Sequence, residues 1–368
     1  MLKIKKQIST LYLSSVLGNL SLTGAWVAIL AVRGYSLTEI GFAETVFHIT
    51  SILFEIPSGV LADLFGRKKM LIASSIIRLL GNIVMIFSCN LFMVCTSIAF
   101  HAMSYNFSSG SGEALAYDSL KSAGEETYYE KYASNQLAIY RLCSGISTLC
   151  AGFALLIGHR AAYGTDILMC AVQIWVLTSL WEAGVCGKDR GSFKNVSRSI
   201  RKEFMQCFLS SISFIKNEKR TIFLMFCNSL VGAVDILLLF FLQAKLPAAG
   251  ISEWGLGFAL FFMEMGGILG AKAILKCKKF SYRSVFLVTG VFVLSGVFME
   301  HLPSYIIMAL GGFAAAFGDD ALQVRTNRIL QDMFPSEQRA TLISMESFTF
   351  SMIMIILSPL AGILFSYW

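Results

Sequence analysis

The sequence predicts an all-α integral membrane protein built from two parallel pseudo-repeats of membrane-spanning helices. Its composition, the length of its apolar segments and an internal repeat support this prediction. Hydrophobic residues make up 56% of the 368 residues and charged residues 14%, with a mean hydropathy of +0.67. Soluble domains average about 45–50% apolar and about 25% charged residues. Most of the chain is therefore expected to lie inside a bilayer.

Eleven segments have the length and apolarity of a membrane span, which needs about 20 residues. They are expected at 9–32, 38–63, 70–89, 91–121, 132–158, 162–183, 220–246, 251–276, 283–300, 303–331 and 340–367. Residues 1–183 then form an N-terminal half with six helices, and residues 220–368 a C-terminal half with five.

The connection between the halves, residues 184–219, is basic and long. It carries apolar residues at helical spacing, namely Phe204, Phe208, Ile212 and Ile215. This pattern predicts an amphipathic helix on the inner face of the membrane. Basic cytoplasmic loops are usual, so nucleic acid is not an expected partner.

Lysine and arginine set the orientation of the helices. If the N-terminus lies in the cytoplasm, external segments hold only Arg33, Arg160 and Lys245, whereas the alternate segments hold most other bases. Basic residues concentrate on the cytoplasmic side of membrane proteins. The sequence therefore predicts a cytoplasmic N-terminus.

The two halves repeat with an offset of 207 residues. Gly59 corresponds to Gly266, Glu113 to Asp320, and each acid is followed by Ala-Leu. Glu130 and Glu337 share the same offset. On this alignment the second half stops before its sixth helix, so the C-terminus is expected outside.

Charge gathers in the stretch GVLADLFGRKK, residues 59–69, between two apolar segments. Gly59 and Gly66 allow a close helix contact and a tight turn. Arg67 can bridge Asp63 to Asp118. The simpler alternative is that the bases here only set orientation.

This stretch resembles the signature of the major facilitator superfamily of secondary transporters, roughly G-x-L-A-D-x-x-G-R-K. The matching residues are Gly59, Leu61, Ala62, Asp63, Gly66, Arg67 and Lys68. Glu55 to Ser58 and Gly112 to Asp118 also resemble a bacterial branch of the family.

The resemblance implies transport by alternating access, with Asp63, Arg67 and Asp118 as a latch that closes when the cavity opens outward. Asp63 would face the helix that begins near Ala340. Two departures speak against a standard drug/proton antiport mechanism. The fourth helix has Asn106 where proton-coupled members usually carry arginine, and the fifth helix has no proline.

Ionisable residues inside membrane helices cost about 2.5–3.5 kcal/mol on insertion scales, so they are functional candidates. Glu44, His48, Ser51 and Glu55 lie on one face of the second helix. They are candidates for a proton relay, with a polar stripe satisfied by neighbouring helices as the alternative.

A second set of acids is expected to bind a substrate or an ion. Its members are Glu113, Asp235, Asp319 and Asp320. Asp319 and Asp320 could instead pair with Arg325 or Arg328. Arg78 and Arg141 are expected to need acidic partners, for which Glu44, Glu55 and Glu113 are candidates.

Other motifs carry little chemistry. Gly110-Ser111-Gly112 and Gly266 to Gly270 are expected to be helix-packing surfaces. No nucleotide-binding, hydrolase or metal-site pattern occurs, and the nine cysteines show no CxxC spacing. The chain is therefore not expected to be an enzyme or to hold a metal or cofactor.

The resulting hypothesis is an ion-coupled transporter of a small molecule, with protons as the favoured ion and efflux of an amphipathic compound as the favoured direction. We expect a monomer in the lipid bilayer of a bacterial cytoplasmic (inner) membrane. The alternatives are a nutrient uptake permease, or a membrane protein that binds a ligand without transporting it, such as a degraded transporter.

Overall fold

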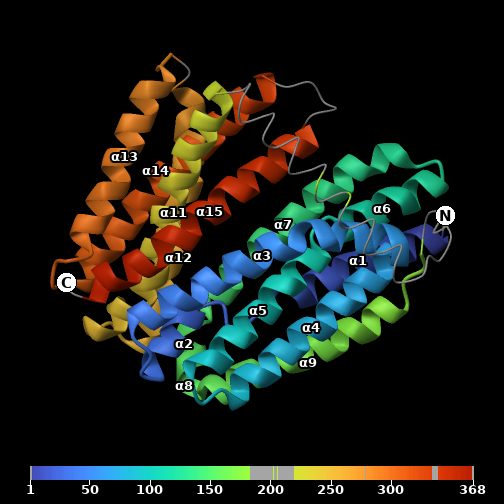
Figure 1. The fold of residues 1–368 in the computed structure, drawn as a ribbon, viewed down its shortest axis with the longest axis horizontal. Helices are drawn as coiled ribbons and strands as arrows, with labels where there is room; N and C mark the ends of the chain where they lie inside the picture. The colour runs from blue at the N-terminus through green and yellow to red at the C-terminus, as the bar shows by residue number, and fades with distance from the viewer. Residues whose placement is uncertain are drawn as a thin grey trace. The chain divides into compact units, whose positions relative to one another are not determined.

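The computed structural model describes residues 2–182, 202, 205, 219–277, 279–333 and 339–366, and all regular structure in these ranges is helical (Figure 1). Inside these ranges, nothing is described for the side chains of a few helical residues, including Asp63, Glu130 and Ala340. Nearly all of the predicted amphipathic linker, 184–219, lies outside the described residues.

The N-terminal half contains the six predicted segments, three of them broken. Its helices are α1 (Leu2–Asn19), α2 (Trp26–Val32), α3 (Leu37–Phe65), α4 (Arg67–Phe87), α5 (Leu91–Ser108), α6 (Ser111–Ser122), the 3-10 turn η1 (Glu126–Tyr128), α7 (Tyr129–Leu149), α8 (Ala151–Ile157) and α9 (His159–Thr178).

The C-terminal half contains the other five segments. Its helices are α11 (Lys219–Ala248), α12 (Glu253–Ala273), the 3-10 turn η2 (Ile274–Lys276), α13 (Tyr282–Met299), α14 (Tyr305–Met333) and α15 (Arg339–Ser366). Among the described helices, eight are long and apolar enough to cross a membrane, or nine if the pair α7–α8, bent by 49°, is one span. The division into six and five spans remains a prediction.

At the first break, between α1 and α2, a buried acid of α9 accepts hydrogen bonds from the polar groups that the break leaves without helical partners. Asp166 accepts hydrogen bonds from the backbone N–H of Leu22 (3.2 Å) and from the hydroxyls of Ser21 (2.7 Å) and Thr23. Buried backbone groups outside a helix need such partners. A polar break can therefore persist in an apolar segment.

The second break, between α5 and α6, occurs at Gly110. Its φ of +69° lies in the left-handed region, which glycine adopts at no steric cost. A Cβ at Gly110 or Gly112 would meet no atom within 4 Å. The prediction that this glycine pair is a helix-packing surface was therefore wrong, since Gly110 serves to interrupt the helix.

The chain forms two compact units. Unit 1 comprises Met1–Gly24, Val46–Ser147 and Ile157–Phe208, and unit 2 comprises Ala25–Thr45, Thr148–Leu156 and Leu209–Trp368. In unit 1, α4 packs against both α5 and α9, as Figure 1 shows. Unit 2 has a core of buried apolar side chains from α11 to α15, on which two segments from the N-terminal half of the sequence also pack.

Close helix packing in unit 2 depends on glycine. A Cβ at Gly266 or Gly270 of α12 would collide with the backbone carbonyl of Phe313 or Phe317 of α14. The predicted packing role of this glycine pair is thus confirmed. A Cβ at Gly41 would likewise collide with the backbone carbonyl of Ser358, also within unit 2.

The turn after α13 buries charge. The side chain of Glu300 is fully buried and forms an ion pair with Lys245 of α11. Burial and then Lys245 lower the pKa of His301. His301 Nδ1 lies 3.2 Å from Glu300 Oε2. Burial is the larger of the two causes of this lowered pKa.

Candidate functional site

The turn from α3 to α4 carries the charged signature, and the structure shows how it is held. Gly66 has a φ of +95°. Arg67 Nη1 lies 2.5 Å from Asp118 Oδ2, and each side chain is 29% exposed. The predicted contact of Arg67 with Asp118 is present. The contacts predicted for Asp63, including the one with the start of α15, lie outside the described side chains.

Glu182, which the sequence did not single out, anchors the same turn. Its carboxylate accepts hydrogen bonds from the backbone N–H groups of Arg67 (2.9 Å) and Lys68 (3.1 Å) at the start of α4. Lys68 Nζ donates in turn to the carbonyl of Thr178 (2.8 Å), the last residue of α9, and to that of Leu180 just beyond it. Each charge faces the helix end of opposite sign. The only sequence signal was an acid at the very end of the sixth apolar segment, 162–183.

The polar face of α3 is largely buried. Glu44 is 8% exposed and His48 6%, while Glu55 is half-buried. Ser51 Oγ donates to Asn106 Oδ1 of α5 (3.0 Å), and Asn106 Nδ2 donates to the Ser51 carbonyl (2.6 Å). Asn106 thus links two helices through neutral hydrogen bonds. A proton relay along this face remains a prediction.

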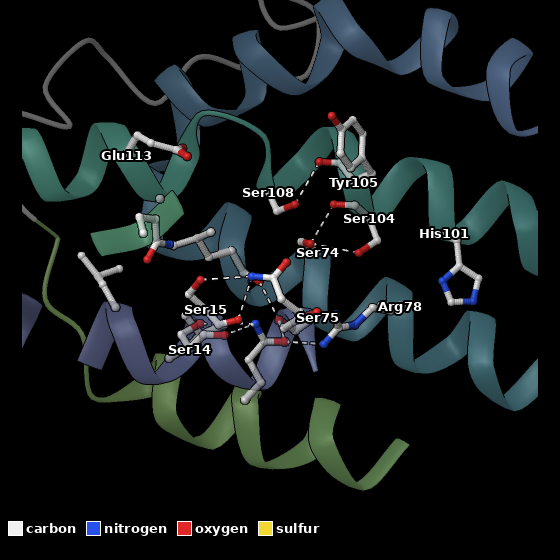
Figure 2. A pocket seen from close by; sticks show the side chains of 18 of the residues that line it. Ser14, Ser15, Ser74, Ser75, Arg78, His101, Ser104, Tyr105, Ser108 and Glu113 are labelled. Carbon is white, nitrogen blue, oxygen red and sulfur yellow. Dashed lines mark hydrogen bonds between the residues drawn. The ribbon is translucent and has the colours of Figure 1, made fainter. Parts of the chain in front are cut away.

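A polar cavity of about 320 Å³ lies inside unit 1, between α1, α4, α5, α6, α7 and α9. Figure 2 shows Arg78, His101, Glu113 and six serines around it. His101 and Glu113 stand at opposite ends of this group in the view. The sequence did not reveal the cavity, because its lining comes from helices far apart in the chain.

Arg78 of α4 is held in the cavity wall by neutral groups. Its guanidinium donates to Gln173 Oε1 (2.7 Å), to the Gly18 carbonyl and to Cys170 Sγ (3.1 Å). Among the residues that the structure describes, no carboxylate lies within ion-pair distance of Arg78. The predicted pairing with Glu44, Glu55 or Glu113 was therefore wrong, because three neutral acceptors satisfy the guanidinium.

The acids predicted to bind an ion in the C-terminal half come together in unit 2. Asp235 of α11 lies close enough to Asp319 and Asp320 of α14 to interact electrostatically with both. Asp319 Oδ1 would lie 3.2 Å from a Cβ at Gly232 of α11, and Asp320 lies directly against Gly267 of α12. Both glycines therefore leave room for the carboxylates.

Other intramembrane acids of unit 2 bridge helices. Asn228 Nδ2 of α11 donates to Glu346 Oε1 of α15 at 3.2 Å, and Thr148 Oγ1 donates to Glu264 Oε1 of α12 at 2.8 Å. Within the described parts of the chain, no three His, Cys, Asp or Glu side chains are arranged to hold a metal ion.

Comparison with solved structures identifies the fold. The chain superimposes on the nucleoside transporter NupG with a TM-score of 0.74, at 13% identity, over 100% of this chain and 92% of that one. A D-xylose-proton symporter gives a TM-score of 0.67 at 10% identity, covering 97% of this chain and 89% of that one. At these identities the likeness concerns the fold alone.

Sequence comparison gives the family. An MFS-type transporter of Bacillus subtilis, YxaM, whose function is uncharacterised, is 22% identical over 330 residues, or 88% of this chain and 79% of the relative. The inner membrane protein YqcE of Escherichia coli is 41% identical over 68 residues, 18% of this chain and 16% of that protein. The model of the Major Facilitator Superfamily matches residues 8–281. The chain therefore belongs to the Major Facilitator Superfamily and is a multi-pass membrane transporter, not an enzyme.

Proposed function

We propose that this protein is a proton-coupled secondary transporter of a small polar solute. It works as a monomer, by alternating access, in a bacterial cytoplasmic membrane. The observation that carries the proposal is the group of three carboxylates, Asp235, Asp319 and Asp320, inside unit 2.

Electrostatics connects this group to ion coupling. Charges of like sign repel strongly where water and its high dielectric are excluded. A membrane interior also penalises the burial of charge. A bound cation or proton relieves both costs, and its release on the other side of the membrane restores them. Such a group therefore suits a site that loads and unloads one ion in each cycle.

The polar cavity of unit 1 bears on the solute. Its wall presents hydroxyls, amides and a guanidinium beside the apolar side chains of Leu11, Leu71 and Leu177. This lining favours a polar solute over the amphipathic compound expected from the sequence, and so favours the uptake alternative over efflux. Structural neighbours named as nucleoside, D-xylose-proton and peptide transporters are consistent with this choice.

The signature residues and the polar face of α3 complete the proposal. The ion pair of Arg67 with Asp118, together with Asp63, acts as the latch that opens once per cycle. Glu44, His48 and Glu55 carry protons along α3. Both roles rest on family resemblance and on the arrangement of these side chains along one helix face and at one turn.

Proton movement in inside-out vesicles tests the proposal. A pH-sensitive dye reports proton flux as sugars, sugar acids, nucleosides and amino acids are added one at a time. We expect at least one solute to trigger flux in the wild type and none to do so in Asp319→Asn. Glu264→Gln is the matched control. It also neutralises a carboxylate in unit 2, but Glu264 of α12 accepts a hydrogen bond from Thr148 and is not one of the three acids.

A solute-triggered signal of wild-type size in Asp319→Asn would contradict the assignment of the acids. Solute uptake without any proton signal in the wild type would contradict proton coupling itself.

A further inference from the structure

We infer that the cavity in unit 1 binds a small organic anion rich in hydroxyl groups, such as a sugar acid or a sugar phosphate. The acidic end of the ligand lies on Arg78 and its hydroxyls lie on the serine-lined wall. This inference names the solute class of the proposed transport and rests on that function only for the translocation step, since binding itself can be measured without transport.

The charge of Arg78 is the first argument. A guanidinium carries five N–H groups and cannot be deprotonated in a protein. Three of these groups are used by Gln173, Gly18 and Cys170, all of which are neutral acceptors. One N–H on each terminal nitrogen remains, and no described carboxylate pairs with the charge. An oxyanion entering the cavity would supply the missing counter-charge and accept both hydrogen bonds.

The position of the charges within the cavity gives the ligand a direction. Arg78 and His101 line it, and His101 lies close enough to feel the charge of Arg78. Glu113 also lines the cavity, but its side chain is exposed and it stands away from His101 in Figure 2. The negative end of a ligand is therefore drawn toward Arg78 and repelled from Glu113.

The hydroxyl-rich wall is the second argument. Six serines line the cavity: Ser14, Ser15, Ser74, Ser75, Ser104 and Ser108. Ser74 donates to the Ser104 carbonyl (2.7 Å) and Ser108 to the Tyr105 carbonyl (2.9 Å), as Figure 2 shows. A hydroxyl that donates one hydrogen bond still has lone pairs that can accept others. The wall can therefore accept hydrogen bonds from several ligand hydroxyls.

Two polar atoms of α7 in the same wall lack partners. Tyr132 Oη and Gln136 Oε1 are buried and make no hydrogen bond to any described residue. The Tyr132 ring is held in place by stacking on Tyr12, with centroids 5.2 Å apart. A buried polar group without a partner costs about 1–3 kcal/mol. A ligand hydroxyl that reaches these atoms would relieve that cost.

The volume limits the ligand to the size of a monosaccharide. Small-molecule sites span about 300–1,000 Å³, and this cavity of about 320 Å³ is at the small end. The competing explanation is that water alone fills the cavity and satisfies Tyr132 and Gln136. In that case, no solute would bind with a preference for negative charge.

Calorimetric titration of the purified protein in lipid nanodiscs distinguishes anion binding from a cavity that holds water alone. The probes are D-gluconate, D-glucuronate and D-glucose 6-phosphate, each compared with a neutral counterpart, sorbitol for gluconate and D-glucose for the other two. We expect at least one anion to bind more tightly than its neutral counterpart. Whether the carboxylates or the phosphate bind identifies the acidic group.

Variants then place the ligand. Arg78→Gln should weaken anion binding by about 10- to 100-fold, since a hydrogen bond to a charged group contributes about 1.5–3 kcal/mol. Arg141→Gln is the matched control, because Arg141 is an exposed arginine of unit 1 that does not line the cavity. Tyr132→Phe removes only the unpartnered hydroxyl and should weaken binding about 3- to 10-fold. If Arg78→Gln does not fold, Tyr132→Phe still tests whether the ligand lies in this cavity.

Three results would overturn the inference: no binding by any of the three anions, equal binding of anions and their neutral counterparts, or anion binding unchanged in both Arg78→Gln and Tyr132→Phe. Each would leave the proton-flux test of the proposed function standing, because that test depends on neither the cavity nor this solute class.

Discussion

Removing the carboxylate of Glu182 should destabilise unit 1. In the structure this group accepts two backbone hydrogen bonds, of 2.9 and 3.1 Å, from the first residues of α4. A Cβ at Gly66 would lie 2.8 Å from Glu182 Oε2. Glycine at this position therefore permits both the positive φ of the turn and the approach of the carboxylate. On this account the signature glycine and Glu182 act together as a helix cap.

The magnitude follows from the two contributions that the carboxylate makes. Loss of an N-terminal cap costs about 0.5–2 kcal/mol, and loss of a negative charge at a helix N-terminus costs about 0.3–1 kcal/mol. Glu182→Ala should therefore cost about 2 kcal/mol, or about 4–8 °C in melting temperature for a unit of this size. Glu182→Gln keeps an acceptor oxygen and loses only the charge, so it should cost about half as much.

Thermal unfolding in detergent, followed by tryptophan fluorescence at one scan rate, measures these shifts. A fixed scan rate matters because membrane proteins often unfold irreversibly. Glu126→Ala is the control, since Glu126 is an exposed acid of unit 1 in the turn η1. If Glu182→Ala melts at the same temperature as Glu126→Ala, the capping argument is wrong.

Three further predictions concern other parts of the chain. Asp118→Asn removes the partner of Arg67; with both side chains 29% exposed it should cost under about 1 kcal/mol in melting experiments while slowing solute flux. Gly270→Leu should be strongly destabilising, by about 3 kcal/mol or failure to insert, whereas Gly290→Leu, where a Cβ meets nothing within 4 Å, should melt like the wild type. Burial lowers the pKa of His301, so below about pH 6.5 the unfolded state takes up a proton that the folded state does not, and stability falls. His301→Gln should therefore lose less stability than the wild type between about pH 7.5 and 5.5. If stability falls with pH as steeply in His301→Gln as in the wild type, the prediction is wrong.

Apolar segment length predicted where the helices lie, but not where they break. Each of the eleven predicted segments contains helix, yet 9–32, 91–121 and 132–158 are interrupted. Hydropathy averages over a window and does not register a local φ such as that of Gly110. It also cannot show that Asp166, far along the chain, satisfies the first break.

The candidate site was predictable where a motif or a helix face carried it. The signature identified the contact of Arg67 with Asp118, and the repeat offset pointed to Asp320. Glu182 was missed because its partners lie more than a hundred residues away. The error over Arg78 had a different cause. Charge pairing is a sound expectation inside a membrane, but a sequence does not show that Gln173 and a backbone carbonyl reach the guanidinium first.

Solute accumulation driven by an imposed pH gradient is the measurement that tests proton coupling most directly. Proteoliposomes are loaded with buffer, placed in a more acidic medium and supplied with a radiolabelled solute that triggered proton flux. The account predicts that the wild type concentrates the solute, and that Asp319→Asn exchanges it across the membrane without concentrating it. If Asp319→Asn concentrates the solute as the wild type does, the three carboxylates of α11 and α14 are not the coupling site.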